Sequence, residues 1–538
     1  MADFRQVLEQ IKVPRNRSYF IYKEIILYNL YGVDIMNDAV EICKLRLFLK
    51  LASELKQGED IEALPDIDFN IRAGNSLIGY TSTADMENAI KAEEGELNLD
   101  DRTAEIRETA KKLSKEFRLF RDKQMERGGK LGAQDKKSLR YKLQESVNKL
   151  DHFLAQDYKV KPNDNDFQDW RERVQPFHWW AEFHDIIDRD GTGTGGFDVI
   201  VGNPPFLESS RVKYSPKGFR TNGTIQGYFV EQSDKILSKE GGMSMVFPLA
   251  LISGKRMKVV QDIIETGRSA WYSNFSIRPA KLFDGVDIRI AIFIGNSSSK
   301  TKVFSTGYKR WVTKTREILM PTLHYTVVSK LEEAYWIPKF QSHLDKSIFD
   351  KVVKQKLSIE KVCGKGEKAV YYRRTGVGYW CAFTNFSPKF FTNGVPGTGR
   401  TQEKEFINKK YESIIVVALL SSNVFYWWYT IVANMRDMMK SDIKEFRTNP
   451  SIFNDHDLLE LGKEYLADIK ANSYLQTREQ RNTGTIQTQS FKIRKSKPII
   501  DKIDAVLSRH YGFTAEELDF IQNYDIKFRV DAPETDEN

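Results

Sequence analysis

The segment with the clearest chemical potential is Asn203-Pro204-Pro205-Phe206, which directly follows the apolar run FDVIVG. The side-chain oxygen of Asn203 and the backbone carbonyl of Pro204 can each accept a hydrogen bond, and the two prolines stiffen this backbone. Phe206 adds an aromatic face. Two fixed acceptors beside a ring suit a planar ligand that carries an amino group; the competing interpretation is a rigid turn that merely ends a strand.

The elements that must position this segment read as α/β. We predict a strand over 197–201, with Gly202 allowing the turn, and a second strand ending at Asp34 in NLYGVDI. Asn37 is the expected N-cap of a helix whose apolar residues recur at helical spacing: Val40, Cys43, Leu47 and Leu51. Ligands of open α/β sheets lie at the carboxyl ends of such strands.

Between these strands the chain turns polar and lysine-rich. After a short strand expected in FNIRAGNSLIGY, two helical stripes are separated by Gly128 and Gly129. The first stripe is Ile106, Leu113, Phe117 and Phe120, and the second is Leu143, Val147, Leu150 and Leu154. This pattern predicts an inserted helical hairpin. The α/β pattern resumes in GYFVEQSDKILSKEGGMSMVFP and KLFDGVDIRIAIFIG, which favours a mostly parallel sheet covered by helices.

Composition bounds the remaining possibilities. A chain of 538 residues with 41% hydrophobic content is expected to form two or three domains. It contains no run of apolar residues long enough to span a membrane and no signal-peptide core near its start, so we expect a cytoplasmic protein. Three scattered cysteines, and histidines without HExxH spacing, lead us to expect no metal site. A net charge of +8 permits a nucleic-acid partner.

NPPF after FDVIVG resembles the catalytic motif of adenine-specific DNA methyltransferases of the NPPF/Y type. The segments NLYGVDI, AVEICKLRLFL and IRAGNSLIG resemble neighbouring motifs of large methylase-specificity proteins from type IIG-like restriction-modification systems and DISARM-like phage-defence systems. The resemblance covers a little more than half of the chain. It implies a Rossmann-like sheet that binds S-adenosylmethionine and methylates the amino group of an adenine flipped out of double-stranded DNA.

The resemblance also assigns roles to single residues. Asn203, Pro204, Pro205 and Phe206 would hold the flipped adenine. A cofactor site would be formed by Asp34 and Ile35, beside the ribose, and by Asn75 and Ser76, beside the cofactor's adenine. Both sites also have a purely structural interpretation, since Asp34 can be a turn residue and GNS is an ordinary turn sequence. Phe283, in LFDGV, is equally credible as a contact of the flipped base and as core.

One family motif is missing from the sequence. Related enzymes place a glycine-rich segment, D-P-x-x-G-x-G, after a first strand that lies upstream of GVDI, whereas Arg5 to Leu30 reads as helix here. We therefore expect the sheet to lack its first strand. Three explanations remain open: the chain is truncated, a separate N-terminal methylase fragment or another defence-system subunit completes it, or the fold persists without methylation.

The loop LESSRVKYSPKGFRTNGTIQGYF follows the catalytic motif and has no acidic residue between Glu208 and Glu231. Its four cations are candidates for contacting DNA phosphates, or for a merely solvated loop: Arg211, Lys213, Lys217 and Arg220. Residues 470–502 hold eight Lys or Arg and two acids, and LLSSNVFYWWYT resembles part of a target-recognition domain. We interpret the aromatic run Phe425 to Tyr429 as core.

We thus predict four regions: 1–84, the first part of the methyltransferase domain; 85–190, a helical insertion; 191–304, the second part with NPPF; and 305–538, a mixed α/β target-recognition domain. The leading hypothesis is a truncated or split adenine-specific DNA methyltransferase. The alternative is a noncatalytic DNA-binding or assembly subunit with a methylase-like fold. A nuclease is not expected, because no P-D followed by D/E-x-K at suitable spacing is present.

Overall fold

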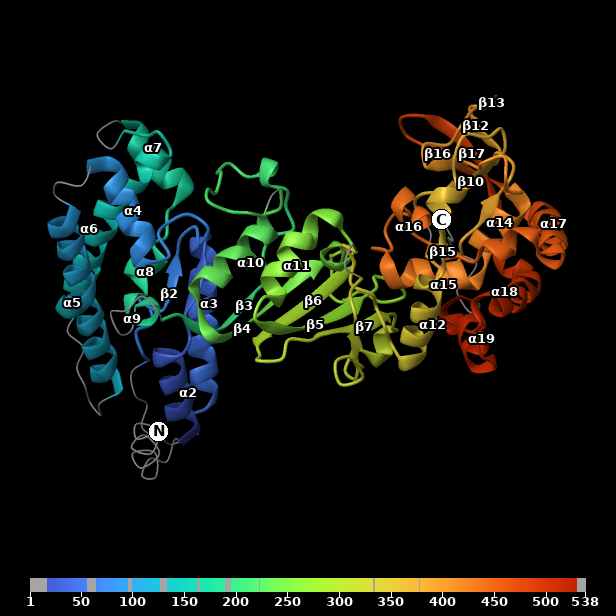
Figure 1. Ribbon diagram of the computed structural model, residues 1–538. Helices are drawn as coiled ribbons and strands as arrows, with labels where there is room; N and C mark the ends of the chain where they lie inside the picture. Colours follow the sequence, from blue (N-terminus) through green and yellow to red (C-terminus); the bar gives the residue numbers. More distant parts are fainter. Residues whose placement is uncertain are drawn as a thin grey trace. The chain divides into compact units, whose positions relative to one another are not determined.

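A computed structural model of the chain describes residues 17–55, 64–94, 99–125, 133–161, 165–188, 195–221, 223–331, 334–376 and 378–529 (Figure 1). The chain divides into two compact units, Met1–Met243 and Ser244–Asn538. Both contain helices and strands, so the predicted mixed α/β character is confirmed. The predicted change of domain near residue 305 and the Rossmann-like strand order remain predictions.

The first unit contains two short sets of strands. β1 (Gly32–Asp34) pairs in parallel with β2 (Ile71–Ala73), and β3 (Phe197–Gly202) pairs with β4 (Leu237–Pro248), which runs on into the second unit. Among the described residues β1 and β3 belong to different sheets, and each is an edge strand. Val199 and Val201 of β3 are 69% and 75% exposed. An apolar strand is thus left uncovered, which is unusual at a sheet edge.

The helices of the first unit include the predicted hairpin. They are α2 (Arg17–Tyr28), α3 (Asn37–Ser53), α4 (Thr83–Glu94), α5 (Leu99–Met125), α6 (Ala133–Asp157), α7 (Asn165–Val174), α8 (Trp179–Glu182), α9 (His184–Ile187) and α10 (Ile225–Ile236). Helices α5 and α6 lie side by side (Figure 1). All eight residues of the two predicted stripes are buried, which confirms that interpretation. Gly128 and Gly129 lie outside the described residues.

One detail of the predicted helix after β1 is wrong. Asn37 is the first residue of α3, and Met36 occupies the N-cap position without a side-chain hydrogen bond. The reason is local, because the backbone N–H of Met36 already donates to the side chain of Asp34 at 2.8 Å. The turn after β1 is therefore organised by Asp34.

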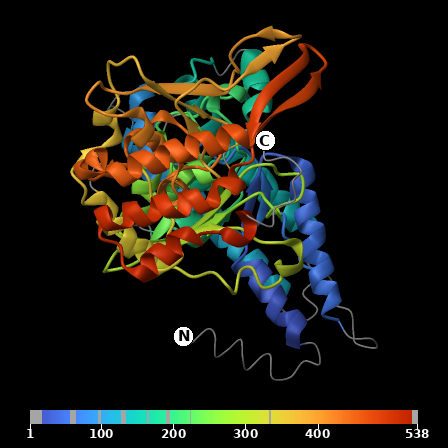
Figure 2. The same ribbon diagram turned by 90° about the vertical axis from the view of Figure 1, so that its right-hand side faces the viewer.

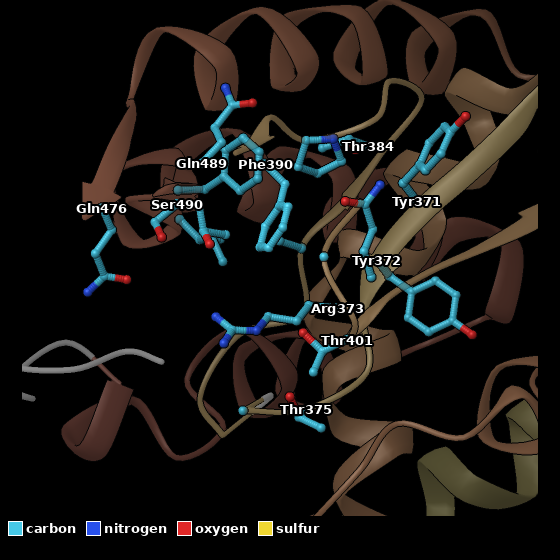
Figure 3. A pocket seen from close by; sticks show the side chains of 18 of the residues that line it. Tyr371, Tyr372, Arg373, Thr375, Thr384, Phe390, Thr401, Gln476, Gln489 and Ser490 are labelled. Atoms are coloured by element: carbon cyan, nitrogen blue, oxygen red, sulfur yellow. The ribbon is translucent and has the colours of Figure 1, made fainter. Parts of the chain in front are cut away.

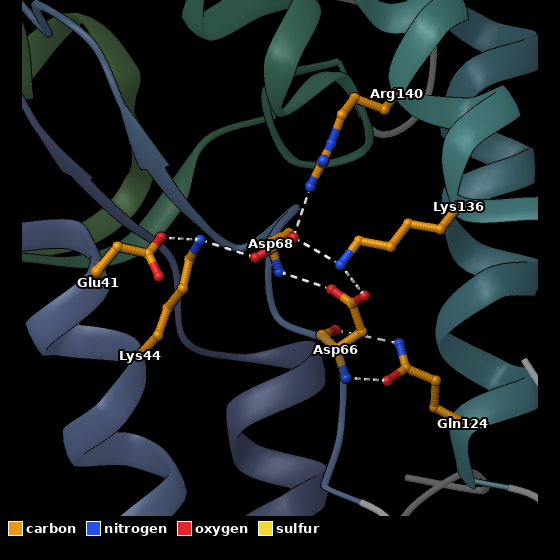
Figure 4. Close-up of polar contacts among 7 residues, drawn as sticks. All are labelled: Glu41, Lys44, Asp66, Asp68, Gln124, Lys136 and Arg140. Atoms are coloured by element: carbon orange, nitrogen blue, oxygen red, sulfur yellow. Dashed lines mark hydrogen bonds and ion pairs between the residues drawn. The ribbon is translucent and has the colours of Figure 1, made fainter. Parts of the chain in front are cut away.

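Paired carboxylates join the hairpin to the chain that leads into β2 (Figure 4). Asp68 accepts hydrogen bonds from Lys44 of α3 at 2.7 Å and from Arg140 of α6 at 2.6 Å. Lys136 forms ion pairs with both Asp68 and Asp66. Burial opposes ionisation of Asp68, but the hydrogen bonds from Lys136 and Lys44 outweigh it and lower the pKa to about 2. The network fixes β2 against two helices.

The second unit begins with strands of mixed direction. β5 (Arg268–Phe275) pairs antiparallel with β6 (Ile290–Ser297) and parallel with β7 (Val303–Lys309), and β7 pairs antiparallel with β8 (Thr326–Val328). Helix α11 (Lys258–Glu265) contacts β5. The strand predicted in RIAIFIG is confirmed as β6, although these pairings are more mixed than the mostly parallel sheet that we predicted.

Small sheets and helices fill the remainder of the second unit. The strands are β9 (Leu357–Ser358), β10 (Ala369–Arg373), β11 (Phe383–Thr384), β12 (Phe390–Thr392), β13 (Val395–Pro396), β14 (Gln402–Phe406), β15 (Arg447–Thr448), β16 (Ser473–Gln480) and β17 (Gly484–Phe491). The helices are α12 (His343–Val353), α13 (Ile359–Val362), α14 (Ser413–Ser421), α15 (Asn423–Val432), α16 (Lys440–Lys444), α17 (His456–Ala471), α18 (Lys497–Tyr511), α19 (Ala515–Gln522) and α20 (Ile526–Arg529). Figure 2 shows β16 and β17 as a long two-stranded ribbon. A cavity of about 1010 Å³ lies between the sheet of β13, β12, β17 and β16 and the sheet of β11, β10 and β14 (Figure 3).

Helix α15 lies in the core of this unit, and every residue of Phe425 to Tyr429 is at most 1% exposed, which confirms the prediction for the aromatic run. In the described part of the chain, no single helix has both the length and the apolar character needed to cross a membrane. Among the described helices, the pair α14 and α15, bent by 61° at their junction, meets this test of length and composition when taken together.

Candidate functional site

The carboxyl end of the β1–β2 pair brings together two of the predicted cofactor residues. Asp34 pairs in register with Ala73, and the N–H of Gly74 donates to the carbonyl of Asp34 at 2.9 Å. Asn75 therefore follows β2 beside the end of β1. The Asp34 side chain is exposed, and one of its oxygens accepts from the Met36 N–H. This contact leaves its second oxygen for a hydroxyl group. Ile35 is exposed next to it.

Asn75 is buried, and its own loop uses only part of its hydrogen-bonding capacity. Its side-chain oxygen accepts from the Leu77 N–H at 3.2 Å, and its backbone N–H donates to Gln175 at 2.7 Å. The side-chain nitrogen, Nδ2, is buried without a partner in the described part of the chain. Such a donor costs about 1–3 kcal/mol unless an acceptor meets it. This cost favours a ligand with an acceptor, such as a ring nitrogen.

The loop after β2 is tied to an aromatic cluster from residues far along the chain. Trp179 donates its indole N–H to the carbonyl of Ser76 at 2.9 Å. Phe177 lies where a side chain at Gly74 would project, because a Cβ there would come within 2.8 Å of its ring. Sequence reasoning missed both contacts, although the aromatic-rich segment FHWWAEF, 177–183, was a visible signal.

A buried histidine, His178, contacts the same loop. His178, which is fully buried, accepts from the Tyr80 N–H at 3.2 Å and lies 3.1 Å from Asp151, which also pairs with Arg171 at 2.8 Å. Glu182 pairs with Arg72 of β2 at 2.7 Å. Burial raises the pKa of Glu182, and the neighbouring Arg72 opposes this change. Because these groups are paired inside the unit, we assign them a structural role.

Asn203 begins the turn that leaves β3, at the predicted place. Its side chain is exposed, Pro204 is buried and Phe206 is half-buried. In the described part of the chain, neither the Asn203 amide nor the Pro204 carbonyl has a hydrogen-bond partner. Both predicted acceptors are therefore open to a ligand.

The residues after this turn are held in place by helix α10. The N–H of Leu207 donates to Pro205 at 2.9 Å, and the N–H of Ile225 donates to Leu207 at 3.0 Å. In the amide orientation that satisfies its neighbours, Gln226 donates to the carbonyls of both Pro205 and Leu207 at 3.2 Å. These contacts occupy the carbonyls of Pro205 and Leu207, whereas the Pro204 carbonyl has no donor among the described residues.

The two predicted sites rest on one aromatic cluster within the first unit. The ring of Phe197, at the start of β3, lies 6.0 Å from Tyr31, just before β1, and 5.8 Å from Trp179. Phe183 contacts the rings of both Tyr31 and Phe197. The starts of β1 and β3 are therefore packed together even though the strands share no backbone hydrogen bonds.

The four cations of the loop after β3 are not equivalent. Arg211 and Lys213 are exposed and form no ion pair with the described residues. Lys217 donates to the carbonyl of Asp157 and lies over the ring of Tyr158. Arg220 lies 3.7 Å from Glu231 of α10, which the sequence placed at the far end of an acid-free stretch. Of the four, Arg211 and Lys213 are the cations without a partner in the described part of the chain. Phe283, in the second unit, is 40% exposed.

The residues fit the adenosine part of S-adenosylmethionine. Asp34 offers a carboxylate oxygen for ribose hydroxyls, and the buried Nδ2 of Asn75 offers a donor for a ring nitrogen. No glycine-rich loop that could approach the methionine part lies among the described residues. The site is therefore matched to the adenosine half of the molecule.

A model of the Eco57I restriction-modification methylase family matches residues 28–283, just under half of the chain. A putative type II restriction enzyme and methyltransferase from Methanocaldococcus jannaschii is 30% identical over 304 residues. That alignment covers 48% of this chain and 25% of the relative, so the chain spans about a quarter of the length of the curated relative.

Solved structures of restriction-modification enzymes show weaker likeness. The type IIL enzyme MmeI in complex with DNA has a TM-score of 0.38 at 12% identity, covering 97% of this chain and 78% of that chain. A nuclease-deletion mutant of the type ISP enzyme LlaGI, with a DNA substrate mimic, has a TM-score of 0.40 at 9% identity, covering 96% and 52%.

Residues 28–283 are thus similar in sequence to restriction-modification methylases, which supports a DNA methyltransferase role. This stretch contains the residues of the predicted cofactor site, the NPPF segment and the cationic loop.

Proposed function

We propose that the chain is an adenine-specific DNA methyltransferase of a restriction-modification or phage-defence system, which transfers a methyl group from S-adenosylmethionine to the amino group of a flipped adenine. The observation that carries this proposal is the pair of open acceptors, the Asn203 side-chain oxygen and the Pro204 carbonyl, at the end of β3. The similarity of residues 28–283 to restriction-modification methylases supports it.

Asn203 and Pro204 act by holding the two amino hydrogens. The lone pair of an adenine amino nitrogen is delocalised into the ring, and two preorganised acceptors favour the more tetrahedral nitrogen that can attack a methyl group. Phe206 offers a face for stacking the base. The base must leave the duplex to reach these groups, at a cost of a few kcal/mol that stacking and hydrogen bonds offset.

Asp34 and Ile35 would lie beside the ribose of S-adenosylmethionine, and Asn75 and Ser76 beside its adenine. The cofactor supplies the methyl group when it is bound. Asp34 is suited to this position because its turn already fixes one carboxylate oxygen, and Asn75 because its Nδ2 is buried without a partner among the described residues. Hydrogen-bonding to a ligand would remove the cost of that unpaired donor.

The proposal is tested by methyl transfer from labelled S-adenosylmethionine to duplex DNA, followed by identification of the methylated base. We expect N6-methyladenine, and we expect Asn203→Ala to lower the rate by about 10²-fold or more, as the loss of a preorganised partner does. Asn29→Ala is the matched control, because Asn29 is exposed and its side chain contacts no hydrogen-bonding group of the described chain. Methylated cytosine, or equal rates for both variants, would overturn the proposal.

One observation favours a second candidate, a noncatalytic DNA-binding or assembly subunit. β1 and β3, which end at the two halves of the site, are edge strands of different sheets in the described part of the chain. Calorimetric titration with S-adenosylmethionine separates the candidates. Binding that Asp34→Ala abolishes supports the enzyme, whereas DNA binding without cofactor binding supports the noncatalytic subunit.

A further inference from the structure

Gln226 of α10 is a polar side chain inside the first unit, and it contacts the residues that follow Pro204. It is 5% exposed. Burying a side-chain amide is unfavourable unless its hydrogen bonds are made. With its nitrogen toward them, Gln226 has two acceptors, the carbonyls of Pro205 and Leu207, each at 3.2 Å. Because a side-chain amide carries two hydrogens, it is matched in number to these two acceptors.

The NPPF turn needs donors from outside because it has few of its own. Pro204 and Pro205 have no N–H, so their backbone can accept hydrogen bonds but cannot donate them. The N–H of Leu207 donates to the carbonyl of Pro205 at 2.9 Å, which closes a tight turn around Phe206. This is a single bond within the segment. Gln226 adds two more from a neighbouring helix.

The start of α10 is held by the same segment. Ile225 is the first residue of the helix, so its N–H has no acceptor within the helix, and the Thr224 side chain at the N-cap position makes no capping hydrogen bond. The Ile225 N–H donates instead to the carbonyl of Leu207 at 3.0 Å. The helix and the turn are therefore joined by three hydrogen bonds, one from Ile225 and two from Gln226.

Holding the Pro205 carbonyl orients the groups on both sides of it. The peptide bond between Pro204 and Pro205 is planar, and the proline ring fixes φ of Pro205 at about −65°. One soft torsion, ψ of Pro205, then remains between the two carbonyls, and the hydrogen bonds to the Pro205 carbonyl restrict it. Phe206 lies at the centre of the turn that Leu207 closes, so the direction of its ring depends on the same contacts. Gln226 thus acts on Pro204 and Phe206 through the backbone.

We propose that Gln226 is a positioning residue for methyl transfer: its amide directs the Pro204 carbonyl toward the amino group of the flipped adenine and the Phe206 ring toward the face of the base. This inference rests on the proposed function. It adds a residue outside the NPPF segment, on the next helix, that no sequence motif indicated. Gln226 itself does not contact the base.

The first test removes both donors and keeps a buried side chain. In Gln226→Leu each carbonyl retains one backbone donor, the N–H of Leu207 or of Ile225, so the variant should fold. With a duplex that the parent protein methylates, kcat should fall about 10²-fold, as a misplacement of about 1 Å causes. The KM for S-adenosylmethionine should change by about twofold at most, because Asp34 and Asn75 lie beside the other pair of strands. Gln226→Met, with an unbranched side chain, should behave in the same way.

Gln232 provides the matched control. It lies on the same helix and is also buried, and its side-chain nitrogen has no partner in the described part of the chain. Gln232→Leu should therefore keep the kcat and KM of the parent. Equal losses of kcat in Gln226→Leu and Gln232→Leu, or a rise in KM with kcat unchanged in Gln226→Leu, would overturn the positioning role.

A base analogue separates positioning from a general loss of structure. Purine lacks the 6-amino group, so a duplex with purine at the target position cannot use the Pro204 carbonyl. Binding of the adenine and purine duplexes to the parent and to Gln226→Leu forms a double-mutant cycle. We expect the variant to raise Kd about fivefold for the adenine duplex, as the loss of one hydrogen bond does, and by less for the purine duplex. Equal changes for both duplexes would mean that the side chain acts on the fold and not on the amino contact.

Failure of this inference is distinguishable from failure of the proposed function. A parent chain that methylates adenine, with Gln226→Leu equally fast, retains the function and loses the inference. A parent chain that transfers no methyl group loses both, whereas amide hydrogen exchange still decides whether Gln226 holds the turn. The Leu207 N–H should exchange faster in Gln226→Leu than in the parent and at the parent rate in Gln232→Leu; equal rates in all three would show that Gln226 does not hold it.

Discussion

Trp179 donates its indole N–H to the carbonyl of Ser76 at 2.9 Å, and its ring packs edge-on against Phe197 at 5.8 Å. One side chain thus contacts both the loop that follows β2 and the first residue of β3. The candidate cofactor residues and the strand that ends just before Asn203 are joined by this contact. It fixes the backbone that carries Asn75, whose Nδ2 has no partner among the residues that the structure describes.

Trp179→Phe should raise the KM for S-adenosylmethionine about fivefold and leave kcat nearly unchanged. The phenyl ring keeps most of the packing, and the lost hydrogen bond costs about 1 kcal/mol. Trp170→Phe is a matched control, because the buried indole N–H of Trp170 has no partner to lose in the described part of the chain. Equal effects of the two variants, or a fall in kcat alone, would contradict a positioning role for Trp179.

The cationic loop yields a second prediction. Arg211→Ala and Lys213→Ala should each weaken DNA binding and lower the salt dependence by about one counterion, because neither cation has an ionic partner within the described chain. Arg220→Ala and Lys217→Ala should change the salt dependence less, because these side chains already contact Glu231 and Asp157. Fluorescence anisotropy at several salt concentrations measures all four. The prediction fails if the two pairs have the same slopes.

Local sequence patterns predicted the elements that depend on neighbouring residues. Short apolar runs indicated β3 and the end of β1 at Asp34, and helical spacing indicated the buried stripes of α5 and α6. These signals succeed because the residues that share a face lie within a few positions of one another. The predicted N-cap at Asn37 is wrong by one residue. Met36 occupies that position, and its N–H donates to the side chain of Asp34.

Contacts between distant segments were not predictable from the same patterns. Trp179 and Ser76 are separated by 103 residues, and Phe390 meets Thr488 only through the register of β12 and β17. Arg220 lies in a stretch of sequence without acidic residues, but in the fold Glu231 of α10 lies 3.7 Å from it. Only the fold specifies such partners, so these pairings had no counterpart in the sequence analysis.

The exposed strand β3 gives a stability prediction. Val199→Thr and Val201→Thr should change the free energy of unfolding by less than about 0.5 kcal/mol, because both side chains are largely exposed. Phe183→Ala, at a position that is 2% exposed, should cost about 3 kcal/mol. Urea unfolding followed by tryptophan fluorescence measures each difference. A loss of more than about 1 kcal/mol for either valine variant would show that this face is covered in solution.

The carboxylate network around Asp68 gives a pH prediction. Its pKa, about 2 in the folded chain, lies below the ordinary value, so ionised Asp68 stabilises the fold at pH values above about 4. This contribution, about 1 kcal/mol after solvent screening, should disappear as the pH falls toward 2. Asp68→Asn should therefore destabilise the protein near neutral pH, and the gap from the parent should close on acidification.

The matched control is Glu145→Gln, since Glu145 is exposed on α6 and has no ionic partner within the described residues. Unfolding by urea at a series of pH values gives the free energy for the parent and both variants. Glu145→Gln should follow the parent at every pH. A difference between Asp68→Asn and the parent that stays constant down to acidic pH would mean that the loss is one of packing, because only an ionised carboxylate makes the difference depend on pH.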